Sequence, residues 1–158
     1  MRYSILRTPI GELQLTADDD GALTGVNLPG CHADPRLWIR DDDALRAART
    51  QLTEYFGGER TAFELPLRPG GGAFQLRVWE ALRAIPYGET TSYGALARAL
   101  GAPGAARAVG AANGANPIAI VVPCHRVVGA SGALTGYAGG LACKRALLDL
   151  EIGRAALV

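Results

Sequence analysis

The stretch IAIVVPCHRV, residues 118–127, runs from five apolar residues into a proline, a cysteine, a histidine and an arginine. A thiol reacts as the thiolate, so a base or a positive charge beside it favours chemistry at that cysteine. His125 and Arg126 follow Cys124 directly, but adjacent side chains usually point apart, and buried cysteines are more often structural than catalytic. These ten residues therefore leave a reactive and a structural cysteine both open.

The other cysteines bear on metal binding and on the cellular compartment. Cys31, Cys124 and Cys143 make an odd number without a C-x-x-C pair, which argues against a disulfide framework and an all-cysteine zinc site. Cys31-His32 and Cys124-His125 offer four ligands, but adjacent residues rarely reach one ion. We therefore predict no metal. We also predict a reducing cytoplasm, because the chain shows neither a signal peptide nor an apolar run long enough to span a membrane.

Around the cysteine motif the pattern is mostly helical. We expect helices over 74–85, 93–100, 105–112 and 143–150, and a glycine-rich loop over 129–140. The second and third helices are joined by a tight turn, which is the spacing of a helix-turn-helix and also of an ordinary helical hairpin. In the third helix Arg107 is the one long side chain among small ones. Such a helix either packs tightly on a neighbour or enters a nucleic-acid groove.

The N-terminal half has a different pattern. Strands are expected over 3–6, 13–16 and 22–28, and residues 29–42 read as irregular. The acids at 41–43 favour the start of a helix over 44–56, where the helix dipole stabilises them. A glycine cluster at 70–72 marks the boundary between domains 1–69 and 70–158. The fold class is α+β, with a small N-terminal antiparallel sheet and a helix packed on a C-terminal helical domain.

Charge is distributed unevenly along the chain although the formal net charge is only +1. Residues 1–66 carry seven arginines and eleven acids, whereas residues 67–158 carry nine basic and four acidic residues. No carboxylate side chain lies between Glu89 and Asp149. The scarcity of acidic residues in the C-terminal half suits binding to an anionic partner such as nucleic acid. It is also explained if this half is simply buried and rich in alanine and glycine.

A long run of motifs resembles the O6-alkylguanine-DNA alkyltransferases, also called methylated-DNA–protein-cysteine methyltransferases, of the bacterial Ogt type. The motifs cover roughly residues 74–151, about half the chain, in the family's order and spacing. They are Phe74-Gln75, Val78-Trp79, Ile85-Pro86-Tyr87-Gly88-Glu89-Thr90, Ser92-Tyr93, Arg107-Ala108-Val109-Gly110, Asn116-Pro117, Pro123-Cys124-His125-Arg126-Val127, Gly136-Tyr137-Ala138-Gly139-Gly140, Lys144 and Glu151.

The resemblance implies a single-turnover reaction without a cofactor. Cys124 would attack the alkyl group on guanine O6 and keep it, activated through a bound water by His125, which Glu151 orients and stabilises as a cation. Tyr93 would assist the departing base and help to rotate the nucleotide out of the duplex. Asn116 would tie the recognition helix to the active-site segment. An RNase H-like N-terminal domain is also implied.

The resemblance further implies a double-stranded DNA partner and action as a monomer, without a protein partner, although relatives can pack cooperatively along DNA. Arg107 would replace the flipped base, on a helix that enters the minor groove through Ala105, Ala106, Ala108 and Gly110. The base pocket would be lined by Val127, Tyr137, Ala138 and Gly139. Several relatives have serine where Ala138 stands, and Thr135 precedes this loop as a further difference that bears on alkyl-group size.

Two alternatives from other classes remain. An ordinary thiol enzyme built on cysteine, histidine and glutamate would turn over and would not need DNA. A non-enzymatic DNA-binding module of the alkyltransferase-like kind would only mark lesions, and these proteins replace the cysteine that this chain retains at Cys124.

Overall fold

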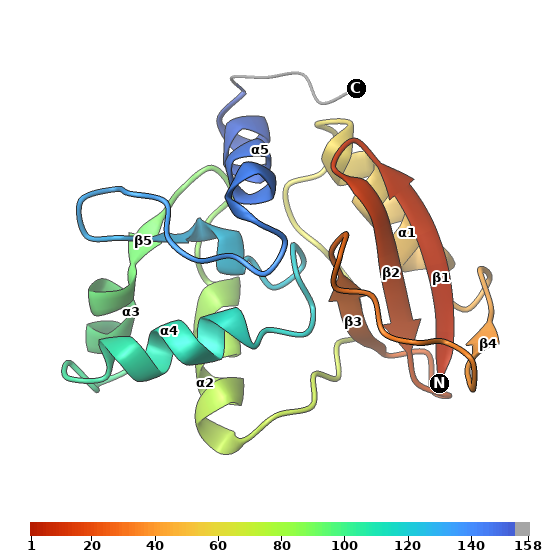
Figure 1. Ribbon diagram of the computed structural model, residues 1–158, viewed down its shortest axis with the longest axis horizontal. Coiled ribbons are helices and arrows are strands. Elements are labelled where there is room, and N and C mark those ends of the chain that lie inside the picture. The colour runs from red at the N-terminus through yellow and green to blue at the C-terminus, as the bar shows by residue number, and fades with distance from the viewer. Residues whose placement is uncertain (154–158) are drawn as a thin grey trace.

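A small β-sheet and a group of helices lie side by side in the computed structural model, which describes residues 1–153 (Figure 1). The sheet has the order β3-β2-β1-β4. The first three strands form the predicted antiparallel meander, while β4 pairs in parallel with β1 from within a segment predicted to be irregular. The strands are β1 Arg2–Thr8, β2 Gly11–Ala17, β3 Leu23–Asn27 and β4 Ile39–Arg40.

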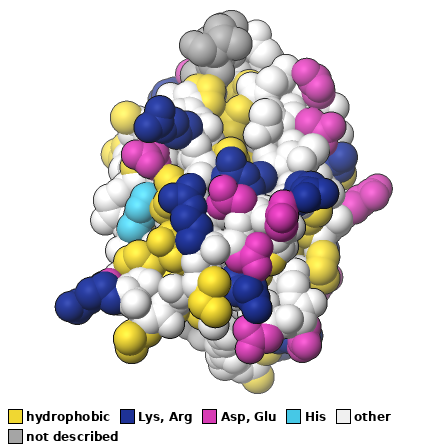
Figure 2. Space-filling view, turned by 90° about the vertical axis from the view of Figure 1, so that its right-hand side faces the viewer, with side chains coloured by type: hydrophobic (Ala, Val, Ile, Leu, Met, Phe, Trp, Pro, Cys, Tyr) yellow, Lys and Arg dark blue, Asp and Glu magenta, His cyan; other side chains and the backbone are white. Residues whose placement is uncertain are grey.

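Helix α1, Arg46–Phe56, covers one face of this sheet and starts two residues later than predicted. Asp41 and Asp42 lie before its first turn and contact strand β1. Arg2 donates to Asp41 at 2.8 Å, and the Ser4 hydroxyl donates to Asp42 at 2.6 Å, while Asp41 also accepts from the Ala44 backbone at 3.0 Å. Acidic and basic side chains are interspersed on this side of the molecule (Figure 2).

The C-terminal part contains the predicted helices, each within two residues of the expected ends. Ser92 caps α3, accepting a hydrogen bond from the Ala95 backbone at 3.1 Å. Two short parallel strands, which the sequence did not predict, pair across this part at Thr91 and Val127. The elements are α2 Ala73–Arg83, β5 Thr91–Ser92, α3 Tyr93–Ala99, α4 Ala106–Gly114, a 3-10 turn Cys124–Arg126, β6 Val127–Val128 and α5 Leu141–Ile152.

The apolar run before the cysteine is part of the core and links the two parts. It folds as a compact turn in which Val122 donates to the Ile118 carbonyl at 3.0 Å, with Ile120 at a φ of 72°. Val26 of β3 donates to the Pro117 carbonyl at 2.9 Å, so the sheet extends onto this turn. The turn therefore delivers Cys124 to the boundary between the two parts.

Helices α2 and α4 are tied together beneath the cysteine segment. The indole of Trp79 donates to the Ala112 carbonyl at 2.8 Å, and both residues are buried. The hydrophobic core runs through both parts as one cluster. Among residues 1–153, no helix is long and apolar enough to cross a membrane.

Candidate active site

Cys124 begins a 3-10 turn and is held by two asparagines. Its backbone N–H donates to the Val122 carbonyl at 2.8 Å. Asn116 closes the preceding turn, because its Nδ2 donates to the Val122 carbonyl at 2.8 Å and its Oδ1 accepts from the Ile118 backbone at 3.0 Å. Asn113, which the sequence analysis missed, lies on α4 and donates to the Cys124 carbonyl at 3.3 Å. The direct tie from α4 to the cysteine is thus made by Asn113, whereas Asn116 shapes the turn that follows the helix.

His125 is fully buried and is oriented by Glu151 of α5. Its Nε2 lies 2.6 Å from Glu151 Oε2, while its Nδ1 has no hydrogen-bond partner within residues 1–153. Because an ionised carboxylate only accepts hydrogen bonds, Nε2 carries the proton and Nδ1 is left as the acceptor. The histidine next to the thiol therefore has a free basic nitrogen.

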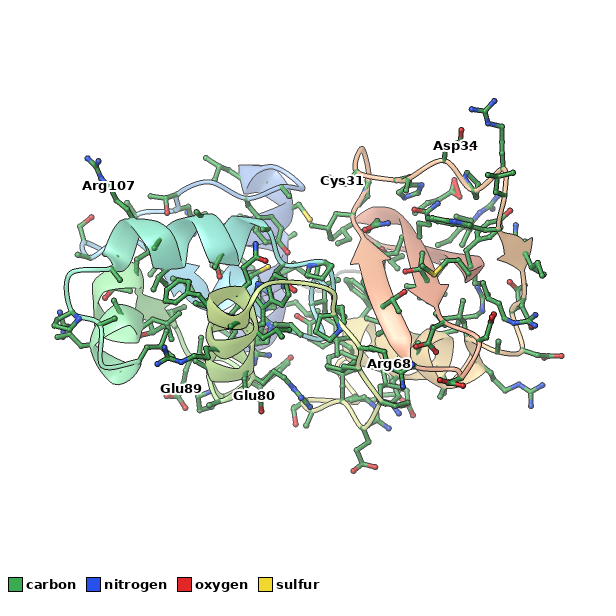
Figure 3. The ribbon with its side chains drawn as sticks, turned by 90° about the horizontal axis from the view of Figure 1, so that it is seen from below. Cys31, Asp34, Arg68, Glu80, Glu89 and Arg107 are labelled. Carbon is green, nitrogen blue, oxygen red and sulfur yellow. The ribbon has the colours of Figure 1, made fainter. Side chains whose placement is uncertain are left out.

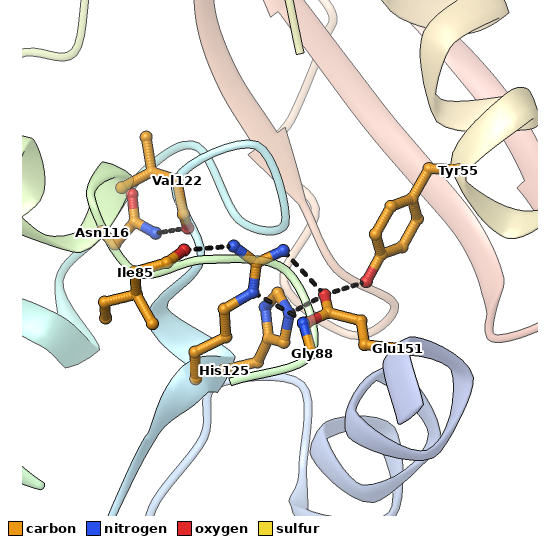
Figure 4. Close-up of polar contacts among 8 residues, drawn as sticks. Tyr55, Ile85, Gly88, Asn116, Val122, His125 and Glu151 are labelled. Carbon is orange, nitrogen blue, oxygen red and sulfur yellow. Dashed lines mark hydrogen bonds and ion pairs between the residues drawn. The ribbon is translucent and has the colours of Figure 1, made fainter. Parts of the chain in front are cut away.

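Glu151 is the centre of a buried network that the sequence revealed only in part (Figure 4). Arg126 donates from Nε to Oε1 at 2.7 Å and from a terminal nitrogen to Oε2 at 3.0 Å. The Tyr55 hydroxyl of α1 donates to Oε2 at 2.6 Å, and the Gly88 backbone donates to Oε1 at 3.2 Å. Burial acts to raise the pKa of Glu151, but the hydrogen bonds from His125 and Arg126 outweigh it and hold that pKa at about 2.

Burial dominates the ionisation of the other two groups. It raises the pKa of the Cys124 thiol, against the smaller opposing effects of Asn116 and Lys144. Burial also lowers the pKa of His125, and outweighs the opposing effect of Glu151. The resting site therefore holds a neutral thiol beside a neutral imidazole.

The Cys124 thiol faces a pocket at the boundary between the sheet and the helices. Cys124, Asn113 and Asn116 line it together with Tyr137 and Ala138 from the glycine-rich loop. The Tyr137 hydroxyl is buried, has no hydrogen-bond partner within the described chain, and lies near enough to Cys124 to influence its pKa. On the sheet side the pocket reaches the loop after β3, which carries Cys31.

A wider groove opens beside this pocket and shares the Gly136–Ala138 wall with it. Tyr93 at the start of α3 and Arg107 of α4 line the groove, and the Tyr93 hydroxyl hydrogen-bonds Thr135 Oγ1 at 3.0 Å. Arg107 is exposed and projects away from α4 at the end far from the sheet (Figure 3). A methyl group added at Gly110 would lie 3.7 Å from the Tyr93 ring, so α4 and Tyr93 are in near contact.

Two residues expected to line the base pocket pack against other parts of the chain. Val127 is fully buried in β6, where its carbonyl accepts from Lys144 Nζ at 2.7 Å. The same ammonium donates to the Thr135 carbonyl at 2.9 Å, so Lys144 fastens the glycine-rich loop. A side chain added at Gly139 would come within 2.9 Å of Leu28, so this glycine allows the loop to pack on the sheet part.

Sequence reasoning did not assign Tyr55, Arg126 and Lys144 to the site. Arg126 and Lys144 stand in the motifs of the resemblance, but only the structure shows that Arg126 binds Glu151 and that Lys144 binds two carbonyls beside the pocket. Tyr55 reads as one more apolar position of α1 and lies 96 residues from Glu151.

Within residues 1–153 no three His, Cys, Asp or Glu side chains are grouped to hold a metal ion.

The fold and site together define a class of protein: a buried thiol with a histidine–glutamate pair, next to a helix-turn-helix that carries an exposed arginine. Residues 1–69 match the family described as the ribonuclease-like domain of 6-O-methylguanine DNA methyltransferase, and residues 73–153 match its DNA binding domain. The chain belongs to the 6-O-methylguanine DNA methyltransferase family.

Named relatives cover almost the whole chain. The methylated-DNA–protein-cysteine methyltransferase of Mycobacterium bovis is 54% identical, over 98% of this chain and 94% of its own. The relative of the same name from Methanosarcina acetivorans is 49% identical, over 96% of this chain and 98% of its own. The crystal structure of Mycobacterium tuberculosis OGT in complex with DNA is 54% identical and superposes with a TM-score of 0.92, covering 98% of this chain and 95% of that one. The RNase H-like and helix-turn-helix parts of the expected fold are thereby confirmed.

Proposed function

We propose that this protein repairs duplex DNA by moving the alkyl group of O6-alkylguanine irreversibly to Sγ of its own Cys124. The observation that carries the proposal is the buried thiol beside His125, whose Nδ1 is free while its Nε2 is held by Glu151. Relatives named methylated-DNA–protein-cysteine methyltransferase support it, since they share half of the sequence over nearly its whole length. The function is therefore a single-turnover methyltransferase that needs no cofactor.

The groups of the site can perform this transfer step by step. Nδ1 of His125 accepts the Cys124 proton through a bound water, and the imidazolium formed is stabilised by Glu151. The thiolate then attacks the alkyl carbon in line; the S–C bond forms as the C–O6 bond breaks, and the electron pair leaves with the guanine. Tyr93, at the rim of the groove, donates a hydrogen bond to the base as negative charge develops, and the departing guanine takes up the proton that His125 had accepted. A thioether is chemically stable, so the protein acts once.

The DNA-binding helix follows from the same arrangement. Helix α4 presents Ala106, Ala108 and Gly110, with Ala105 at its cap, so its backbone can approach the minor groove closely. Arg107 is the exposed side chain that would fill the space left by the flipped base, and Tyr93 would press on the phosphate as the nucleotide rotates. The absence of acids between Glu89 and Asp149 leaves this surface without like charges facing the phosphates.

The remaining assignments concern the pocket, the domains and the setting. Tyr137 and Ala138 line the space for the base, and Val127 and Gly139 hold the pocket wall from behind. Residues 1–69 and 70–158 act as two domains, of which the second binds DNA and accepts the alkyl group. The protein works as a monomer, with cooperative packing on DNA open to it. A thiol that must stay reduced suits the cytoplasm.

Mass spectrometry tests this function directly. After mixing with a duplex that contains O6-methylguanine, the intact protein should gain one methylene unit, and peptide mapping should place it on Cys124. The unmodified duplex and Cys124→Ser should give no gain, whereas Cys143→Ser should react like the unaltered protein. A folded protein that binds the duplex but gains no mass would belong to the lesion-marking class. If the protein shows no mass gain and does not bind DNA, it is a thiol enzyme with another substrate.

A further inference from the structure

Asn113 carries a buried hydrogen-bond acceptor that nothing in the described chain satisfies. The residue lies near the end of α4 and is 3% exposed. Its Nδ2 donates to the Cys124 carbonyl at 3.3 Å, whereas its Oδ1 has no partner within residues 1–153. Because Nδ2 donates to the Cys124 carbonyl, a half-turn flip of the side-chain amide would break that hydrogen bond. A buried acceptor without a partner is unfavourable, so a folded protein keeps one only where something balances that cost.

The position of Asn113 points to the substrate as that partner. Asn113 lines the pocket that also contains Cys124, Tyr137 and Ala138. The side chain is bonded to the backbone of the nucleophile itself, so Asn113 belongs to the pocket wall beside the reacting sulfur. An unpaired acceptor in that wall is a candidate partner for a base that enters the pocket.

The chemistry of the damaged bases limits what Oδ1 can bind. Alkylation at O6 removes the hydrogen from N1 of guanine, so N1, N3 and N7 are all acceptors. The 2-amino group is then the one remaining N–H donor of the base, and it lies on the same edge as O6. O4-alkylthymine presents no N–H donor at all, and O6-alkylhypoxanthine lacks the 2-amino group. Of these three bases, only O6-alkylguanine can satisfy Oδ1.

We propose that Asn113 is a specificity-determining residue whose Oδ1 accepts a hydrogen bond from the 2-amino group of the flipped O6-alkylguanine. The inference rests on the proposed alkyl transfer and adds to it a reason for selecting guanine. O4-alkylthymine and O6-alkylhypoxanthine leave the acceptor buried and unpaired. Rejection of a base without the donor is strong where a site is built to hydrogen-bond that donor.

Single-turnover rates on two matched duplexes test the proposal. One duplex contains O6-methylguanine and the other O6-methylhypoxanthine at the same position, so they differ only in the 2-amino group. The unaltered protein should react about tenfold or more faster with O6-methylguanine. In Asn113→Leu, which keeps the side-chain volume and removes the acceptor, the ratio of the two rates should fall toward one. The rate on O4-methylthymine, relative to O6-methylguanine, should rise in the same variant.

The ratio separates recognition from a structural role. Loss of the bond to the Cys124 carbonyl would slow both substrates alike and leave the ratio unchanged, which would overturn the proposal. Asn113→Ala gives a second variant, and thermal unfolding checks that each variant is folded. Equal rates on the two duplexes in the unaltered protein would overturn the proposal without any variant. No transfer from O6-methylguanine by the unaltered protein would instead contradict the proposed function.

Discussion

Glu151 shows how one buried side chain holds the site together. Its two oxygens accept from His125, Arg126, Tyr55 and the Gly88 backbone, at distances of 2.6 to 3.2 Å. Removing one partner of a buried charge lowers the free energy of unfolding strongly, because the remaining charged group stays desolvated and unpaired. Replacing the whole pair by apolar residues costs much less. The network therefore fixes the geometry of His125 while the imidazole itself stays neutral at rest.

At the residue scale we predict that stability falls as the pH falls below about 6.5. Burial lowers the pKa of His125, so below the ordinary histidine pKa the unfolded chain binds a proton that the folded chain does not. Each such proton changes the free energy of unfolding by about 1.4 kcal/mol per pH unit. The pKa of about 2 for Glu151 extends the loss below pH 4.5, where unfolded carboxyls take up protons.

Denaturant unfolding between pH 7.5 and 5 measures this slope. His125→Gln should flatten it, whereas His32→Gln, which replaces an exposed histidine, should leave it unchanged. The same slope in both variants would show that His125 is not the group responsible.

At the scale of elements, α4 connects the DNA-facing groove with the nucleophile. Its N-terminal half carries Arg107 and Gly110 on the groove, and its C-terminal half carries Asn113, which binds the Cys124 carbonyl. Trp79 of α2 holds the C-terminal half of the helix through the Ala112 carbonyl. A displacement of α4 would thus be felt at both the arginine and the cysteine.

We predict that Arg107→Ala weakens productive binding of damaged duplex and leaves the fold intact. Arg107 is exposed and pairs with no acid in the described chain, so its loss removes contacts to DNA without exposing the core. The transfer rate at low protein concentration should fall by about tenfold or more, while thermal unfolding changes little. Arg46→Ala is the matched control, since it removes an exposed arginine of α1 with the same change in charge. Equal losses in both variants would indicate only a general charge effect.

At the scale of the whole molecule, the sheet part takes part in the site from across the boundary. The Tyr55 hydroxyl of α1 reaches Glu151 of α5, and Val26 of β3 is bonded to the turn that precedes Cys124. Leu28 packs so closely on Gly139 that a side chain added there would force Leu28 to move. The N-terminal part therefore braces both the acid of the relay and the loop beside the pocket.

We predict that Tyr55→Phe alters the pH dependence of alkyl transfer. The ring keeps its packing, but Glu151 loses a donor, so the carboxylate becomes more basic and the pKa of His125 rises. The acid limb of the rate profile should therefore move to higher pH, and the free energy of unfolding should fall by about 1–3 kcal/mol. Tyr3→Phe, in the same part of the chain but away from Glu151, is the control. An unchanged profile in Tyr55→Phe would restrict Tyr55 to a structural role.

Local patterns were sufficient for most elements of the fold. The strands alternate at period two and the helices at their own period, so they were expected within a few residues of where they lie. Strand β4 was missed because two exposed residues carry no such pattern and are held only by pairing with β1. The later start of α1 has a similar reason, since Asp41 and Asp42 are drawn to β1 by partners distant in sequence.

For the site, the residue types and the order of the motifs could be read from the sequence. The family resemblance assigned roles to Cys124, His125, Glu151, Tyr93 and Arg107, because they stand in motifs that match the family, and these roles stay predictions. Folding added the groups that act through space. Tyr55 meets Glu151 across 96 residues, Asn113 brings a buried, unpaired acceptor to the pocket wall, and burial keeps both thiol and imidazole neutral. Residue types decide which chemistry is available, whereas burial and pairing between distant segments arise only when the chain packs.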